Sequence, residues 1–382
     1  MTNLKNRASK AFFWDIVGNY GGQVIIFIIS IFLARLLSPE DFGLVGMSMV
    51  IIHIFRVFAD MGFASALIQN QSNTHLTYSS VFYLNIVIGI LFTLLIYLGA
   101  PLIGFFYEND RVTTLVEWLS LLFVFNSFNI VQGTILKKKL AFKPISIILL
   151  ISQFVSGGVA IFMAFIGYGV YALVIQQLLI AILNTIILWN VSEWKPAFQF
   201  SWNEVRKITG FSSYLFFGQF LNQLFKQMDT LTVGKLFTPA VLGYYTRAES
   251  LNSLISKNSV STFNRVFFPV LSSLQQEDER FEKVYFQVLD IVSTIAVFSS
   301  GLFFLIGDEI IIGLFGQKWH PSVAVFQILV LKGFTYPLNA LMVNAFLAKG
   351  KAKANFYFGN VRRILQLVPL GVAYFYGFDP FL

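Results

Sequence analysis

Long apolar stretches constrain the fold of this chain more than any other feature. Ten segments carry about 20 mostly apolar residues each, the length that a helix needs to cross a bilayer, and an eleventh, 240–268, is long enough but polar. With 56% of the residues hydrophobic and only 12% charged, no soluble domain could hide this surface from water. The pattern predicts an all-α polytopic membrane protein with about 11 transmembrane helices, at 11–37, 42–66, 80–104, 113–136, 144–166, 169–190, 208–235, 240–268, 284–306, 322–347 and 354–377.

The distribution of Lys and Arg between the loops predicts the orientation. The apolar stretch behind residues 1–10 is too long for a cleaved signal peptide, so we expect it to be the first span. With the N-terminus in the cytoplasm, most loop cations lie inside, and the outer loops hold only Arg35, Arg111, Lys235 and Lys318. This bias requires the polar segment 240–268 to cross the membrane, so we expect that segment to face something other than lipid.

A sequence repeat at an offset of 200 residues predicts two related halves. LARLLSPEDFGLV at 33–45 recurs as VGKLFTPAVLGYY at 233–245, so that Pro39 matches Pro239 and Gly43 matches Gly243. Because six spans separate the equivalent helices, both halves have the same orientation, as in parallel-repeat transporters. We expect an N-terminal lobe of six helices at 1–200 and a C-terminal lobe of about five at 201–382. The repeat also predicts a twelfth helix from about residue 380, so the last helix is expected to be missing.

Polar side chains recur on single faces of the predicted spans. Charges inside a bilayer normally face a cavity or a partner. The polar residues of spans one, two and seven follow helical spacing, and span eight is polar over much of its length. We therefore predict one central substrate cavity between the lobes, lined by Asp15, Asn19, Gln23, Arg56, Asp60, Gln219, Gln223, Lys226, Asp229, Arg247, Glu249, Lys257, Lys332, Arg362 and Arg363.

The embedded charges include more bases than acids. A cationic cavity at low dielectric attracts anions such as pyrophosphate and repels cationic drugs. An alternative is that Arg56 neutralises Asp60, and Lys226 neutralises Asp229, within their own helices.

The chain lacks the residue patterns of an enzyme or a metalloprotein. It has no Cys, and its three His are far apart, so a conventional zinc site is not expected. It contains no Walker A motif and no soluble domain in which to build a catalytic site. We expect no enzyme activity, no cofactor and no nucleic-acid partner.

Four segments carry a resemblance to a known family. They are LARLLSPEDFGLVGMSMVIIHIFRVFADMGFASALIQ (33–69), QGTILKKKLAFKPIS (132–146), DTLTVGKLFTPAVLGYYTRAESL (229–251) and FNRVFFPVLSSLQQEDERF (263–281). Together they resemble the polysaccharide transporters of the multidrug/oligosaccharidyl-lipid/polysaccharide (MOP) superfamily. Within it, they are most similar to the colanic-acid exporter and related O-antigen and exopolysaccharide repeat-unit flippases.

The resemblance implies a bilobal bundle with alternating access in the bacterial cytoplasmic (inner) membrane. The implied substrate is an undecaprenyl-pyrophosphate-linked oligosaccharide, moved from the cytoplasmic to the periplasmic leaflet. Membrane lipids and a polysaccharide polymerase are the other expected partners. Three alternatives remain: a cation-coupled multidrug exporter, a peptidoglycan-precursor flippase, and a non-transporting scaffold of a polysaccharide assembly complex.

Overall fold

The computed structural model describes residues 2–351, 353–355, 357–359, 361–362 and 365. It describes their side chains except at 2–8, 210–215 and 256–266. All regular elements among these residues are helices, which confirms the predicted all-α class. The chain packs as two compact units, Met1–Ala240 and Val241–Leu382.

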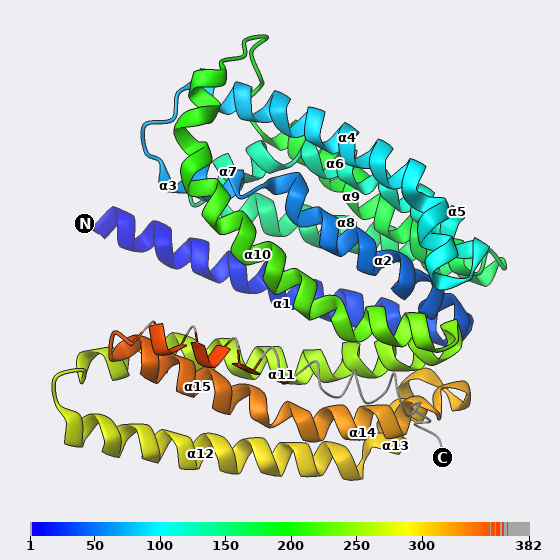
Figure 1. The fold of residues 1–382 in the computed structure, drawn as a ribbon, viewed down its shortest axis with the longest axis vertical. Helices are drawn as coiled ribbons and strands as arrows, with labels where there is room; N and C mark the ends of the chain where they lie inside the picture. The colour runs from blue at the N-terminus through cyan, green and yellow to red at the C-terminus, as the bar shows by residue number, and fades with distance from the viewer. Residues whose placement is uncertain (1, 352, 356, 360, 363–364, 366–382) are drawn as a thin grey trace. The chain divides into compact units, whose positions relative to one another are not determined.

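The first unit contains ten helices among the described residues, coloured blue to green in Figure 1. They are α1 (Thr2–Leu36), α2 (Pro39–Asp60), α3 (Phe63–Gln69), α4 (His75–Tyr107), α5 (Asp110–Ser120), α6 (Leu122–Ser127), α7 (Ile130–Lys138), α8 (Phe142–Phe165), α9 (Val170–Val191) and α10 (Trp202–Leu236).

A capping box fixes the start of α2. The Ser38 hydroxyl accepts the backbone N–H of Asp41 at 3.2 Å, and the Asp41 carboxylate accepts the backbone N–H of Ser38 at 3.0 Å. Pro39 occupies the first turn, where its missing N–H costs nothing and its fixed φ suits a helix. These contacts satisfy helix-end donors, so α2 begins sharply after the turn that follows α1.

Small residues bring α1 and α8 close together. A Cβ atom at Gly22 would lie 2.7 Å from the Gln153 side chain, and one at Gly157 would overlap Ile29. Across the same interface, the Ser146 hydroxyl donates to the backbone carbonyl of Trp14 at 2.5 Å. The two helices therefore pack along the α1 face that carries Gly18 and Gly22.

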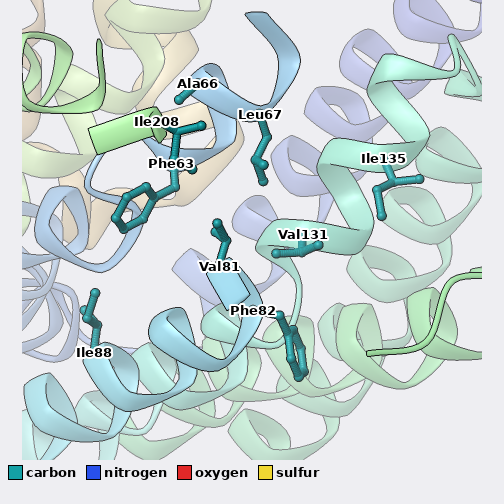
Figure 2. Close-up of a cluster of buried hydrophobic side chains, with 9 residues drawn as sticks. All are labelled: Phe63, Ala66, Leu67, Val81, Phe82, Ile88, Val131, Ile135 and Ile208. Atoms are coloured by element: carbon teal, nitrogen blue, oxygen red, sulfur yellow. The ribbon is translucent and has the colours of Figure 1, made fainter. Parts of the chain in front are cut away.

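A buried apolar cluster joins α10 to the rest of the first unit. Figure 2 shows it between α3, α4, α7 and the beginning of α10. Its α10 member, Ile208, is only 2% exposed. This packing fixes the rotation of α10 about its axis, and the nine buried members are Phe63, Ala66, Leu67, Val81, Phe82, Ile88, Val131, Ile135 and Ile208.

The second unit is a smaller helical bundle. Its core gathers α11, α12 and α15 around Leu271, Phe281, Val292 and Leu341. The elements are α11 (Pro239–Ser273), α12 (Asp278–Leu305), α13 (Gly307–Phe315), the 3-10 helix η1 (Gln317–Trp319), α14 (Ser322–Gly333) and α15 (Thr335–Ala348).

The membrane-spanning character of the chain follows from these helices. Within the described residues, seven helical stretches are long and apolar enough to span, or eight if the pair Asp110–Ser127 and Ile130–Lys138, bent by 43°, is one span. The polar helices α10 and α11 are 35 residues each, about 52 Å at 1.5 Å per residue, so length permits them to cross.

Three further predictions from the sequence concern the number of spans, the boundary between the lobes and the end of the chain. The total of eleven spans and the lobe boundary at residue 200 are not tested by the packing and stay predictions. Packing separates the units at Ala240 and leaves α10 with the first unit, whereas the predicted boundary rests on the repeat. The expected span at 354–377 falls largely outside the described residues, and the expected twelfth helix falls wholly outside them.

Candidate functional site

A polar cavity of about 330 Å³ lies between α2 and α10, within the first unit. The α2 residues recur at intervals of three, four and seven, and those of α10 at four, seven and eight, so each set forms one helical face. The lining residues are His53, Arg56, Val57, Asp60, Gln219, Gln223, Lys226 and Gln227.

Aromatic packing beside the cavity holds the two polar faces toward each other. The Phe58 ring on α2 contacts the α10 rings of Phe216 and Phe220, with centroid distances of 4.8 and 5.1 Å. Phe92 on α4 closes the cluster at 5.5 Å from Phe58. Offset and edge contacts between such rings add about 0.5–1.5 kcal/mol per pair beyond area burial. The charged residues of the cavity therefore lie on two helices, α2 and α10, that these aromatic contacts hold together.

Polar contacts fix both ends of α10 against α4. At one end, the Thr77 hydroxyl donates to Glu204, whose pKa is lowered by hydrogen bonds from Lys207 and then from Thr77. At the other end, the Lys235 ammonium donates to Glu108 at 2.7 Å, and this hydrogen bond lowers the pKa of Glu108. With both ends held, the α10 polar face keeps its register against α2.

The cavity carries more positive than negative charge. Asp60 accepts the backbone N–H of Ala64 at 3.1 Å, and no ion pair joins it to Arg56 among the described side chains. Within that same part of the chain, no hydrogen bond or ion pair holds the Lys226 ammonium. Among the described side chains, direct neutralisation of Arg56 by Asp60 is therefore not seen. Arg56 and Lys226 remain able to bind an anion beside the Gln219 and Gln223 amides.

The predicted residues of α1 lie elsewhere in the first unit. Asn19 donates to the Asp15 carboxylate at 3.0 Å, and Gln23 lies on the same helix. None of the three lines the cavity between α2 and α10. Asp229 is on α10 but is not a lining residue either. The structure thus brings together five of the predicted residues: Arg56, Asp60, Gln219, Gln223 and Lys226.

The other predicted residues belong to the second unit. Glu249 accepts a hydrogen bond from Asn252 at 3.3 Å, whereas Lys332 and Arg362 are exposed. The side chain of Lys257 and the whole of Arg363 lie outside the described residues. Contact of any of these residues with a substrate stays a prediction.

Arg247 has a packing role that its sequence position does not reveal. It is only 8% exposed, and its guanidinium lies 5.3 Å from the Phe315 ring centroid and 5.6 Å from that of Trp319. Trp319 is fully buried. A planar guanidinium stacks on aromatic faces better than an ammonium does. Arg247 therefore joins the beginning of α11 to α13 and η1.

Replacing Arg247 by Lys is expected to destabilise the second unit by about 2 kcal/mol, because the charge remains while the desolvated stacking is lost. Thermal unfolding of the purified protein measures this loss. Lys318→Arg, within the same 3-10 helix, is the control and should leave the unfolding midpoint unchanged. An unchanged midpoint in Arg247→Lys would contradict the packing role.

Two polar lining residues, besides the apolar Val57, were missing from the predicted set. His53 shares the α2 face with Arg56 and Asp60, and Gln227 follows Gln223 by four positions on α10. Extending each helical face by one turn identifies both. Within the described part of the chain, no three His, Asp or Glu side chains converge on a metal site.

Comparison with known proteins gives consistent matches in sequence and fold. The family model described as polysaccharide biosynthesis protein matches residues 32–324. The teichuronic acid biosynthesis protein TuaB of Bacillus subtilis is 28% identical over 309 residues, which are 79% of this chain and 63% of that protein. The chain thus spans less than two thirds of the length of this relative.

Two solved structures share the fold. The lipid II flippase MurJ, in an inward closed conformation, superposes with a TM-score of 0.70 at 16% identity, covering 97% of this chain and 82% of that one. A multidrug resistance transporter of the MOP superfamily, in an inward-facing conformation, gives 0.63 at 14% identity, covering 92% and 86%. The polysaccharide family suggested by the sequence resemblance is confirmed by the family model, and these two structures show that the fold is shared.

Proposed function

This chain belongs to the polysaccharide biosynthesis protein family, and on that premise we propose that it moves a lipid-linked polysaccharide repeat unit across the bacterial cytoplasmic membrane. The observation that carries the proposal is the cavity between α2 and α10, where Arg56 and Lys226 outnumber Asp60. The fold shared with a lipid II flippase supports movement of a lipid-linked substrate.

The proposed substrate is an undecaprenyl-pyrophosphate-linked oligosaccharide. Its lipid tail stays in the bilayer, while Arg56 and Lys226 bind the pyrophosphate by charge-assisted hydrogen bonds. The Gln219 and Gln223 amides bind sugar hydroxyls, because each amide both donates and accepts. Moving this substrate across the membrane requires that the protein position and release its head group, and no covalent bond is made or broken.

Transport proceeds by alternating access in this proposal. The lobes at 1–200 and 201–382 rock about an axis along the membrane normal and carry the head group from the cytoplasmic to the periplasmic leaflet. The N-terminus is cytoplasmic, and a polysaccharide polymerase receives the product. The remaining predicted residues, Asp15, Asn19, Gln23, Asp229, Arg247, Glu249, Lys257, Lys332, Arg362 and Arg363, join the substrate path only in some steps of this cycle.

The charge of the cavity distinguishes this proposal from export of cationic drugs. A cation-binding site needs an acidic excess, whereas Asp60 is the single carboxylate among the lining residues of this cavity. A binding site repels a ligand that carries charge of the same sign as its own. A cationic drug would therefore meet Arg56 and Lys226 at the site where pyrophosphate is bound.

Leaflet-resolved labelling of lipid-linked glycan in cells lacking the gene tests the function. We expect the repeat unit to accumulate on the cytoplasmic side and to clear when the gene is restored. Unchanged surface polysaccharide with no accumulated glycolipid would exclude the flippase and favour drug export or a scaffold role. Accumulation that a transport-dead variant also clears would favour the scaffold.

A further inference from the structure

A second cavity, of about 130 Å³, lies in the first unit where α2, α6 and α9 meet. Amide side chains from two of these helices face it: Asn126 on α6, and Gln177 and Asn184 on α9. His53 and Arg56 line this cavity as well as the one between α2 and α10. One turn of α2 therefore lines both cavities.

The hydrogen-bonding capacity of the amides is largely unused. Asn126 donates its Nδ2 to the Leu122 carbonyl at 2.7 Å, and its Oδ1 remains an acceptor. Gln177 and Asn184 make no side-chain hydrogen bond to the described residues. Gln177 and Asn184 are partly buried and lie seven residues apart on one face of α9. Their donors and acceptors are therefore available to a polar ligand in the cavity.

The rest of the lining suits a sugar ring. Amides donate and accept hydrogen bonds at once, as sugar hydroxyls require. Apolar side chains, including Phe123 and Ile180, supply surface for the C–H groups of a ring. The cavity lining contains no carboxylate. Its chemistry therefore fits a neutral polyhydroxyl group better than a cation.

We propose that the amide-lined cavity is a subsite for the sugar attached directly to the pyrophosphate of the transported lipid. The inference rests on the proposed function and extends it, because it assigns sugar recognition to Gln177 and Asn184. Arg56 is common to both cavities, so a phosphate bound there lies next to the amides. The phosphate then binds at Arg56, and the first sugar ring lies in the amide-lined cavity beside it.

Binding of two probes to the purified full chain tests the subsite. The probes are undecaprenyl pyrophosphate and the lipid-linked repeat unit isolated from cells lacking this gene. We expect the wild-type protein to prefer the repeat unit. The double variant Gln177→Leu/Asn184→Leu should lower this preference by about tenfold, because two hydrogen bonds are lost. Its affinity for undecaprenyl pyrophosphate should not change, whereas Arg56→Ala should weaken binding of both probes.

Matched variants control for folding. Asn190→Leu removes an amide from the exposed end of the same helix and should retain the preference. The single variants Gln177→Leu and Asn184→Leu should each lose part of it, and they give the result if the double variant unfolds. An unchanged preference in the folded amide variants would overturn the subsite and leave the flippase proposal standing. Failure of the wild-type protein to bind either probe would overturn the proposed function itself.

Discussion

Replacing Arg56 by Ala is expected to lower the rate of glycolipid clearance by about ten- to a hundredfold. The guanidinium faces the cavity between α2 and α10 without an ion-pair partner among the described residues, so its hydrogen-bonding groups are available to a phosphate. A hydrogen bond to a charged group contributes about 1.5–3 kcal/mol, and each 1.36 kcal/mol corresponds to a factor of ten. Lys226→Ala should lower the rate comparably.

A control variant separates this effect from a change in net charge. Arg206→Ala removes one cation from the exposed beginning of α10, outside the cavity, and should transport as the wild type does. Arg56→Lys keeps the charge and should retain part of the activity, because an ammonium cannot bind phosphate bidentately. Wild-type clearance by well-expressed Arg56→Ala and Lys226→Ala proteins would show that neither side chain binds the substrate.

The second large effect is expected at Gly43, where Ala should lower the stability of the folded protein strongly. A Cβ atom there would overlap the backbone carbonyl oxygen of Pro239 and lie 3.0 Å from its Cα. Overpacking a core typically costs about 1–3 kcal/mol, and a backbone atom cannot rotate away as a side chain can. This cost exceeds the roughly 0.5–1 kcal/mol by which Ala favours a helix over Gly.

Thermal unfolding and the yield of folded protein measure the effect of Gly43→Ala. Gly158→Ala on α8 is the matched control, since nothing lies within 4 Å of its added methyl group. That variant should unfold at the wild-type temperature or slightly above it. If Gly43→Ala were as stable as Gly158→Ala, the close approach of the turn after α10 to α2 would be disproved.

The position of Gly43 links this packing to the sequence repeat. Gly43 and Pro239 both belong to the repeated motif, in its first and second copies. From the sequence, Pro and Gly were assigned only to local turns. Their direct contact could not be predicted, because a local pattern contains no information about which turns meet.

Sequence periodicity predicted the polar faces of α2 and α10 but not which polar faces share a cavity. The spacing of Arg56 and Asp60, and of Gln219, Gln223 and Lys226, identifies one side of each helix. Asp15 and Asn19 have the same spacing, yet α1 packs on α8 through its glycines. The polar spacing in the sequence shows which side of a helix is polar, whereas tertiary packing decides which other helix that side meets.

A few amides in an apolar span gave too weak a signal to be recognised. Gln177 and Asn184 lie in a mostly apolar stretch beside Gln176 and Thr185, and only their common helical face distinguishes them from tolerated polar residues. At Arg247 the sequence predicted a cavity residue from a charge in a span, and it gave no sign of the packing role of this side chain. The aromatic rings that enclose it come from residues 315 and 319, about 70 positions away in the sequence.

Translocation by the purified protein is the most direct test of the central claim. The protein would be reconstituted in liposomes that carry the lipid-linked repeat unit in one leaflet, and a glycan-specific probe would report its arrival in the other. We predict translocation by the wild-type protein, its loss in Arg56→Ala and its retention in Arg206→Ala. Equal rates in protein-free and wild-type liposomes would contradict the flippase function.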